Sequence, residues 1–201
     1  MDEIMIYIKT LNHYDSLIDE NNDPVYDPAP IKAYMDKWDG EVFIEALILS
    51  PDKSVLEIGV GTGRLAKRVC DKCRHFTGID ISQKTLQRAK ANLQRFSNIG
   101  NFLTYPFSDR FDTIYTSLTF MHIKDKRGAI RKVAGLLKPG GRFVLSIDKN
   151  QQTEINFGNR RIIVCPDTPE EITALIAEAG LTIEKQFETE FAVIFVATKG
   201  D

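Results

Sequence analysis

Short apolar runs alternate with amphipathic stretches along most of the chain after residue 50. These runs, each of strand length and mostly apolar, are Val55–Ile58, Phe76–Ile79, Phe111–Tyr115 and Arg142–Ile147. Between them, apolar residues recur at helical spacing, and Ser82 and Asp125 stand where they can cap two of the helices. Buried strands that alternate with helices are typical of a parallel sheet covered on both faces.

The C-terminal part of the chain departs from this alternation. A strand is predicted at 161–164, and Thr168-Pro169-Glu170-Glu171 then predicts a helix start with a cap, a proline in the first turn and a capping-box glutamate. Two apolar-rich stretches, 182–189 and 191–198, follow with a short turn around Glu190 and predict a β-hairpin. We therefore expect an α/β fold with a mostly parallel sheet and an antiparallel C-terminal hairpin.

The first 50 residues lack the pattern of a buried strand. One helical stripe contains Leu11, Tyr14, Leu17 and Ile18, and two more lie within 31–38 and 42–47. Polar and proline-rich breaks at 21–24 and 27–30 separate them. We predict a helical N-terminal arm or lid over residues 1–50 and one compact domain over residues 51–201.

Composition and charge exclude several classes of protein. The 201 residues include 26 Lys and Arg against 28 Asp and Glu, for a formal net charge of -2, so a nucleic-acid partner is not expected. No apolar run reaches the ~18 residues that a membrane span needs, and no secretory signal is evident, which favours the cytoplasm. The pair Cys70 and Cys73 has too few partners for a zinc site, so no metal is expected. Composition and charge do not indicate the oligomeric state.

A glycine-rich turn is the strongest indication of a ligand. Glu57-Ile58-Gly59-Val60-Gly61-Thr62-Gly63 connects a predicted strand to a predicted helix. Glycines in this position let the backbone approach a ligand closely and adopt positive φ. Asp80 ends the next predicted strand, where a carboxylate can bind both hydroxyls of a ribose. The pattern therefore predicts a nucleoside ligand.

Two classes of nucleoside ligand fit this turn. With the residues that follow it, the turn also matches the pattern that binds a dinucleotide such as NAD. The carboxylate of Glu57 would repel a pyrophosphate, whereas S-adenosylmethionine carries a sulfonium and an ammonium that an acid attracts. A dehydrogenase also needs a substrate domain, for which this chain leaves little room. Both arguments favour S-adenosylmethionine.

Residues 50–201 resemble the Rossmann-like (class I) S-adenosylmethionine-dependent methyltransferases. The motifs that carry the resemblance are Val55–Gly63, Gly78-Ile79-Asp80-Ile81-Ser82, Phe111-Asp112-Thr113-Ile114 and Leu136-Leu137-Lys138-Pro139-Gly140-Gly141-Arg142-Phe143. The resemblance implies a three-layer Rossmann-like sandwich with a seven-stranded sheet, whose last strand is inserted antiparallel.

The resemblance also implies roles for the residues of the turn. Glu57 would face the methionine amino group of the cofactor. Gly59, Gly61 and Gly63 would line its methionine and ribose, and Asp80 would bind the ribose hydroxyls.

Further along the chain, the resemblance implies an adenine site and a methyl-transfer pocket. Ile81 would pack on the adenine. Gly100-Asn101-Phe102 stands where the family has Gly-Asp and a small residue, so the Asn101 amide oxygen would accept the bond from the adenine amine. The strand before it, 96–99, is shorter than the family's fourth strand. Ser117, which follows the 111–116 strand, would line the pocket.

Candidates for catalysis come from two places. His122 is the candidate base, because imidazole titrates near neutral pH, although it could instead only shape the loop. Tyr14 and Tyr26 could close over the acceptor as a lid, or simply pack the arm onto the sheet. The sequence Thr116–Thr119 lacks the Asn/Asp-Pro-Pro-aromatic motif of family members that methylate adenine or glutamine nitrogens.

These observations lead to one hypothesis and two alternatives. The hypothesis is an S-adenosylmethionine-dependent methyltransferase that transfers a methyl group in line to a small-molecule acceptor. The alternatives are a nicotinamide-dependent oxidoreductase and a non-catalytic module that binds S-adenosylmethionine. The sequence does not identify the acceptor or its reacting atom.

Overall fold

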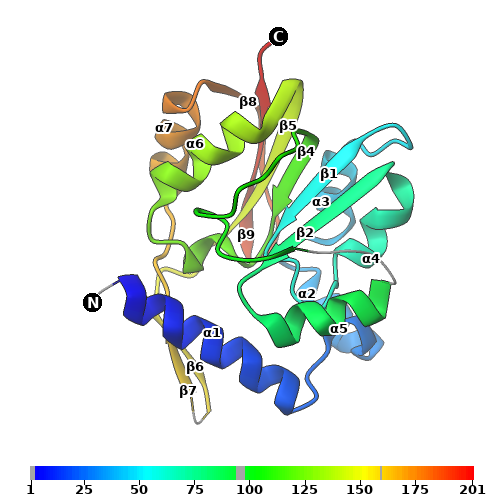
Figure 1. Ribbon diagram of the computed structural model, residues 1–201. Helices are drawn as coiled ribbons and strands as arrows, with labels where there is room; N and C mark the ends of the chain where they lie inside the picture. The colour runs from blue at the N-terminus through cyan, green and yellow to red at the C-terminus, as the bar shows by residue number, and fades with distance from the viewer. Residues whose placement is uncertain (1–2, 94–97, 159) are drawn as a thin grey trace.

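Seven strands form one sheet in the order β3-β2-β1-β4-β5-β9-β8, with helices on both faces (Figure 1). The computed structural model describes residues 3–93, 98–158 and 160–201. Its strands are β1 (Ser54–Ile58), β2 (His75–Asp80), β3 (Asn98–Ile99), β4 (Phe111–Thr116), β5 (Leu137–Asp148), β6 (Glu154–Phe157), β7 (Arg160–Ile163), β8 (Leu181–Glu188) and β9 (Ala192–Lys199).

The helices include seven α-helices and three short 3-10 turns among the described residues. They are α1 (Glu3–Asp19), η1 (Pro24–Tyr26), α2 (Ala29–Met35), α3 (Gly40–Ala46), α4 (Ala66–Val69), η2 (Cys70–Lys72), α5 (Gln83–Leu93), η3 (Phe120–His122), α6 (Lys126–Leu136) and α7 (Pro169–Glu178). None of these helices is both long and apolar enough to cross a membrane.

The strand pairing confirms the predicted fold class. β1 to β5 pair in parallel, and β9 lies between β5 and β8 and runs antiparallel to both. The predicted C-terminal hairpin is thus β8 and β9. β5 begins at Leu137, earlier than the predicted start at Arg142, because the Pro139–Gly141 stretch joins the strand through an irregular pairing.

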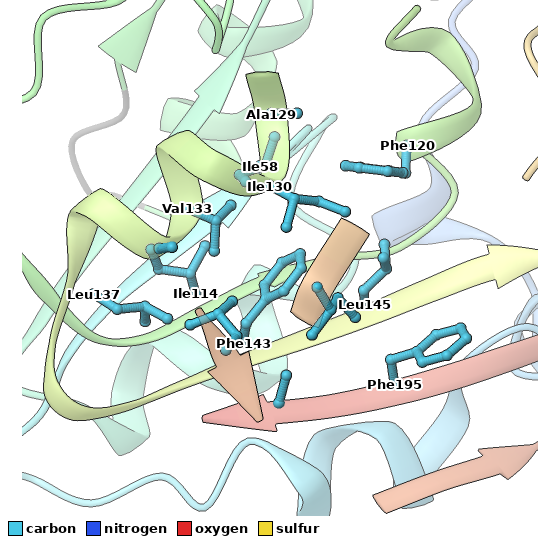
Figure 2. Packing of buried hydrophobic residues seen from close by; sticks show 14 of the residues in the cluster. Ile58, Ile114, Phe120, Ala129, Ile130, Val133, Leu137, Phe143, Leu145 and Phe195 are labelled. Atoms are coloured by element: carbon cyan, nitrogen blue, oxygen red, sulfur yellow. The ribbon is translucent and has the colours of Figure 1, made fainter. Parts of the chain in front are cut away.

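Alternate residues of the central strands face two separate cores. On one face, α6 and α7 cover Leu56, Ile114 and Phe143; on the other, α3, α4 and α5 cover Val55 and Tyr115. Figure 2 shows the first core, where side chains of α6 point onto the sheet. The sheet therefore forms the middle of a three-layer sandwich.

Local sequence signals fixed the predicted helix starts. The side chain of Asp125 accepts a hydrogen bond from the backbone N–H of Gly128 at 2.8 Å, and Thr168 accepts one from Glu171 at 3.3 Å. Ser82 accepts one from the N–H of Thr85 at 3.0 Å. All three residues cap the helices that follow them, as predicted.

Helices α1, α2 and α3 occupy the segment predicted as an arm or lid. α3 packs against the sheet, because Phe43, Ile44 and Leu47 are buried in the core with β1 and β4. α1 instead lies over the carboxyl ends of the strands, where residues of α1 and of the strand ends line one cavity. The division of the chain at residue 50 stays a prediction.

Two short strands after β5 form a separate hairpin, β6 and β7, which lies beside α1 (Figure 1). β7 was predicted, but β6 was not, because most of its residues are exposed and lack an apolar run. The expected strand at 96–99 corresponds to β3, which pairs with β2 at the edge of the sheet. Residues 96 and 97 of that prediction lie outside the described residues.

Candidate active site at the carboxyl ends of the strands

A cavity of about 290 Å³ lies between α1 and the carboxyl ends of β1, β2 and β4. Its walls come from α1, the glycine turn after β1, the end of β2, the loop 100–103 and the loop 117–124. This volume is close to the lower end of the ~300–1,000 Å³ range of ligand pockets. Of the residues predicted for the site, all but Gly63 and Tyr26 line this cavity.

The glycine turn holds its backbone against the loop after β4. Gly59 has a φ of +76°, and an added Cβ there would come within 2.1 Å of the Thr119 side chain. Gly61 has a φ of +56°, and an added Cβ there would meet nothing within 4 Å. Only glycine therefore fits at position 59, while Gly61 presents open backbone to the cavity.

Gly63 lies outside the cavity lining, contrary to its predicted contact with the cofactor. Its φ is +101°, and an added Cβ would lie 3.1 Å from atoms of Leu93. Gly63 thus lets the turn pack closely on α5. Its place in the motif serves this helix packing, and its contact with the cofactor stays a prediction.

Asp80 ties the end of β2 to the glycine turn. One carboxylate oxygen accepts a hydrogen bond from the N–H of Gly61 at 3.0 Å, and the other accepts one from the N–H of Ser82 at 3.0 Å. Burial raises the pKa of Asp80, and the backbone donors oppose this shift. Each oxygen keeps a lone pair for a further donor, such as a ribose hydroxyl.

Glu57 is buried, with 3% of its surface exposed, and accepts a hydrogen bond from the hydroxyl of Tyr115 at 2.8 Å. Burial raises its pKa to about 8, so the carboxyl group holds a proton at neutral pH. The repulsion of a pyrophosphate inferred from the sequence is therefore weaker than expected. A cation bound beside Glu57 would lower this pKa and restore the negative charge.

The loop after β3 forms the wall that would face an adenine. The backbone N–H of Leu103 donates to the side-chain oxygen of Asn101 at 2.9 Å, which leaves this oxygen one lone pair for an amine. Phe102 is buried against Phe107, and Ile81 is half-buried on the opposite strand end. These side chains line one end of the cavity together.

Ser117 takes part in a buried network that the sequence analysis missed. The Asp39 carboxylate is fully buried and accepts hydrogen bonds from Ser117 at 2.8 Å and from Nη1 of Arg64 at 3.0 Å. Arg64 follows the glycine turn and lines the cavity. Next to Ser117, Leu118 has a φ of +54°, which strains its backbone at the cavity wall. Asp39 stands between the predicted helical stripes at 31–38 and 42–47, and its position there gives no sign of these partners.

His122 and Tyr14 meet across the cavity from different elements. The Tyr14 hydroxyl and Nε2 of His122 lie 2.9 Å apart, within hydrogen-bond distance. Burial, reinforced by the charge of Lys126, lowers the pKa of His122 to about 4, so the imidazole is neutral at neutral pH. His122 is therefore a weaker base than the sequence suggested.

Tyr26 does not join Tyr14 over the cavity. Its side chain is 67% exposed, and the ammonium of Lys67 lies 5.4 Å from the centre of its ring. The η1 turn directs this ring away from the cavity lining. The prediction of Tyr26 as part of a lid over the acceptor is not supported by this placement.

Residues 56–145 match the family described as "Methyltransferase domain". This segment contains the glycine turn, Asp80 and the loop after β4. The match makes this segment similar to a methyltransferase domain, as the motifs of the sequence indicate. A similar protein is an uncharacterized methyltransferase of Anoxybacillus flavithermus, which is 35% identical over 118 residues. The match covers 56% of this chain and 56% of that protein.

A demethylmenaquinone methyltransferase of Tropheryma whipplei is 38% identical over 97 residues. The match covers 46% of this chain and 41% of that protein. The chain thus spans about half the length of these curated relatives. What such relatives act on does not transfer directly to this chain.

Solved methyltransferases share the fold over nearly the whole chain. The magnesium protoporphyrin IX methyltransferase of Synechocystis PCC 6803, solved with bound S-adenosylmethionine, has a TM-score of 0.76 at 15% identity and covers 100% of this chain and 98% of that chain. The N-methyltransferase NodS of Bradyrhizobium japonicum WM9 was solved with S-adenosyl-L-homocysteine and has a TM-score of 0.67 at 18% identity. The match covers 96% of this chain and 100% of that chain. At these identities the likeness shows the fold of the methyltransferase domain.

Proposed function

We propose that this chain is an S-adenosylmethionine-dependent methyltransferase that acts on a small molecule. The observation that carries the proposal is the joining of Asp80 to the N–H of Gly61 beside the cavity, within a segment that matches the methyltransferase domain family. This arrangement presents a carboxylate and open backbone to a nucleoside at one place.

The residues around the cavity suit the parts of S-adenosylmethionine. Asp80 would bind the ribose hydroxyls with its remaining lone pairs, and Ile81, Asn101 and Phe102 would surround the adenine. Glu57 would face the methionine end, where an ammonium favours its charged form. When bound, the cofactor supplies a methyl group already activated on a sulfonium, so this chain has mainly to align the acceptor and exclude water.

A small acceptor suits the enclosed position of the cavity. α1 lines one side of the cavity, and the cavity volume of about 290 Å³ is close to the lower end of the range of sites for small ligands. Two similar proteins, the demethylmenaquinone and magnesium protoporphyrin IX methyltransferases, are named for small-molecule acceptors. Both observations support a small-molecule acceptor.

We assign α1 as the lid of this cavity. Its closed position rests on the contact between Tyr14 and His122, and on a hydrogen bond from the Ser82 hydroxyl to Asp15 at 2.6 Å. His122 then acts as a positioning residue that orients the Tyr14 hydroxyl, since its lowered pKa makes it a weak base. Opening of α1 would admit both ligands, and closing would exclude water from the acceptor.

Isothermal titration calorimetry with S-adenosylhomocysteine tests the cofactor assignment. We expect binding with one site per chain, weakened about 10- to 100-fold by Asp80→Ala, because the ribose hydroxyls lose a charged partner. Asp148→Ala serves as the matched control, since Asp148 ends β5 and lies outside the cavity lining. Binding of NAD in place of S-adenosylhomocysteine would refute the proposal. Transfer of a labelled methyl group to small molecules of a cell extract would separate an enzyme from a binding module.

A further inference from the structure

Three buried polar atoms of residues that line the cavity have no hydrogen-bond partner within the described part of the chain. Oγ1 of Thr62 belongs to the glycine turn, whereas Oγ1 of Thr10 lies on α1 and Nδ1 of His122 lies in the loop that α1 contacts. Thr10 is only 2% exposed, although it lies on α1, whose outer face is in solvent. A buried polar atom without a hydrogen-bond partner lowers the stability of the fold. When such an atom belongs to a residue that lines a cavity, the missing partner points to a ligand.

Tyr14 brings a third polar atom to the same part of the cavity. Thr10 and Tyr14 are four residues apart on α1, so their side chains lie on one face of the helix. The Tyr14 hydroxyl lies 2.9 Å from Nε2 of His122. Whichever atom donates in this contact, Nδ1 of His122 remains for a ligand atom, and the Tyr14 oxygen keeps a lone pair. An oxygen group that can both donate and accept matches all three atoms.

The rest of this part of the cavity is apolar. Ile6 and Tyr7 of α1 face it from one side, and Leu103 and Ile123 face it from the loops. Among the described residues that line the cavity, the carboxylates are Glu57 and Asp80, and both belong to the glycine turn and the strand end next to it. Asp80 is near enough to raise the pKa of the Tyr14 hydroxyl, but its oxygens accept from the N–H groups of Gly61 and Ser82 and would also bind the ribose. A cationic amine under α1 would therefore have no carboxylate of its own.

We infer that the methyl acceptor is an uncharged or anionic molecule with an apolar body, whose oxygen groups hydrogen-bond to Thr10, Tyr14 and His122. This inference rests on the proposed function and names the class of its acceptor. Lys124, which is exposed at the cavity rim, adds a positive charge that suits an anion and disfavours a cation. α1 thus carries the specificity for the acceptor as well as covering it.

Binding to the full chain saturated with S-adenosylhomocysteine tests the inference. The probes are 1-naphthol and 1-naphthylmethylamine, which share a ring system and differ in a hydroxyl or a cationic amine. We expect 1-naphthol to bind at least about tenfold more tightly, and Thr10→Val to weaken its binding about 5- to 20-fold, the loss expected for one hydrogen bond. Thr85→Val is the matched control, because Thr85 is also a buried helical threonine with an unpartnered Oγ1 but lies outside the cavity lining.

The outcomes separate the inference from the proposed function. Failure of S-adenosylhomocysteine to bind would overturn the proposed function. If it binds while 1-naphthylmethylamine binds as tightly as 1-naphthol, or while 1-naphthol does not bind at all, the acceptor class is wrong and the proposed function stands. Equal effects of Thr10→Val and Thr85→Val would also overturn the inference, because a general loss of stability would then explain both.

Discussion

The buried acid at the end of β1 gives a direct test of the electrostatics of the site. Burial raises the pKa of Glu57 from its ordinary value of 4.5 to about 8. Between these pH values, the folded chain keeps a proton that the unfolded chain has released, so the free energy of unfolding falls as the pH rises. We predict that Glu57→Gln removes this dependence, because an amide oxygen can still accept from Tyr115 but cannot ionise.

The size of the effect follows from the two pKa values. One pKa unit corresponds to ~1.36 kcal/mol, so the difference between 4.5 and about 8 amounts to about 5 kcal/mol. In the steep part of the window, the free energy of unfolding should fall by ~1.4 kcal/mol for each pH unit. Below pH 4.5 the proton on Glu57 causes no loss of stability, and above about pH 8 the full loss is reached.

Urea unfolding measured at several pH values from about 5.5 to 8.5 checks this prediction. The quantity to compare is the difference in free energy of unfolding between Glu57→Gln and the natural chain, because the other titrating groups contribute to both. This difference should grow with pH in favour of the variant. Glu45→Gln, an exposed glutamate on α3, is the control and should show a constant difference. Parallel curves for Glu57→Gln would refute the reasoning about its buried proton.

Four further substitutions probe the turn, the lid and the buried network. Gly59→Ala should destabilise the fold and abolish S-adenosylhomocysteine binding, because its Cβ would clash with Thr119. Gly61→Ala should lower the free energy of unfolding by only ~1–2 kcal/mol, because of its positive φ. Calorimetry and thermal unfolding distinguish the two variants, and equal losses of stability and binding would contradict the clash. Tyr14→Phe should speed hydrogen exchange of α1 by removing its contact with His122, and an unchanged rate would argue against the lid contact. Asp39→Asn should cost ~3–5 kcal/mol in urea unfolding, because a largely buried guanidinium loses its fully buried charge partner and keeps only the more distant Asp36, and a loss below ~1 kcal/mol would contradict this.

The strands and caps could be predicted because their signals are local. The apolar runs of β1, β2 and β4 and the caps Ser82 and Asp125 each lie within a few residues of the element that they specify. β6 could not be predicted, because an exposed strand is paired by its neighbour and not marked by its own apolar residues. Strand pairing depends on tertiary context, which a single run does not contain.

The buried face of α1 shows why the acceptor side was harder to predict. The sequence stripe places Leu11, Tyr14 and Leu17 inside, but the most buried residues include Thr10 and His13. Buried polar residues interrupt the apolar stripe, so the periodicity marks only part of the buried face, which Thr10 shares with Tyr14. Such exceptions are expected where a helix lines a ligand cavity rather than a core.

On the cofactor side, the motif supplied most of the candidate residues. Gly59, Gly61 and Asp80 line one cavity, because the carboxyl ends of neighbouring parallel strands meet at one edge of the sheet. The ion pair of Asp39 and Arg64 was not predicted, because its members lie 25 positions apart and neither belongs to a local pattern. The proton on Glu57 depends on burial, which the sequence does not state.

The contacts of α1 have a consequence for the order in which the chain folds. α1 precedes its partners in the chain: Asp15 and Tyr14 of α1 pair with Ser82 and His122, and Glu20 just after α1 pairs with Arg160 at 2.6 Å. These partners emerge much later in synthesis, and contacts between distant parts of a chain form slowly. α1 therefore stays unpacked, with its apolar face exposed, until the sheet has formed. During that interval, the exposed apolar face of α1 is accessible to chaperones.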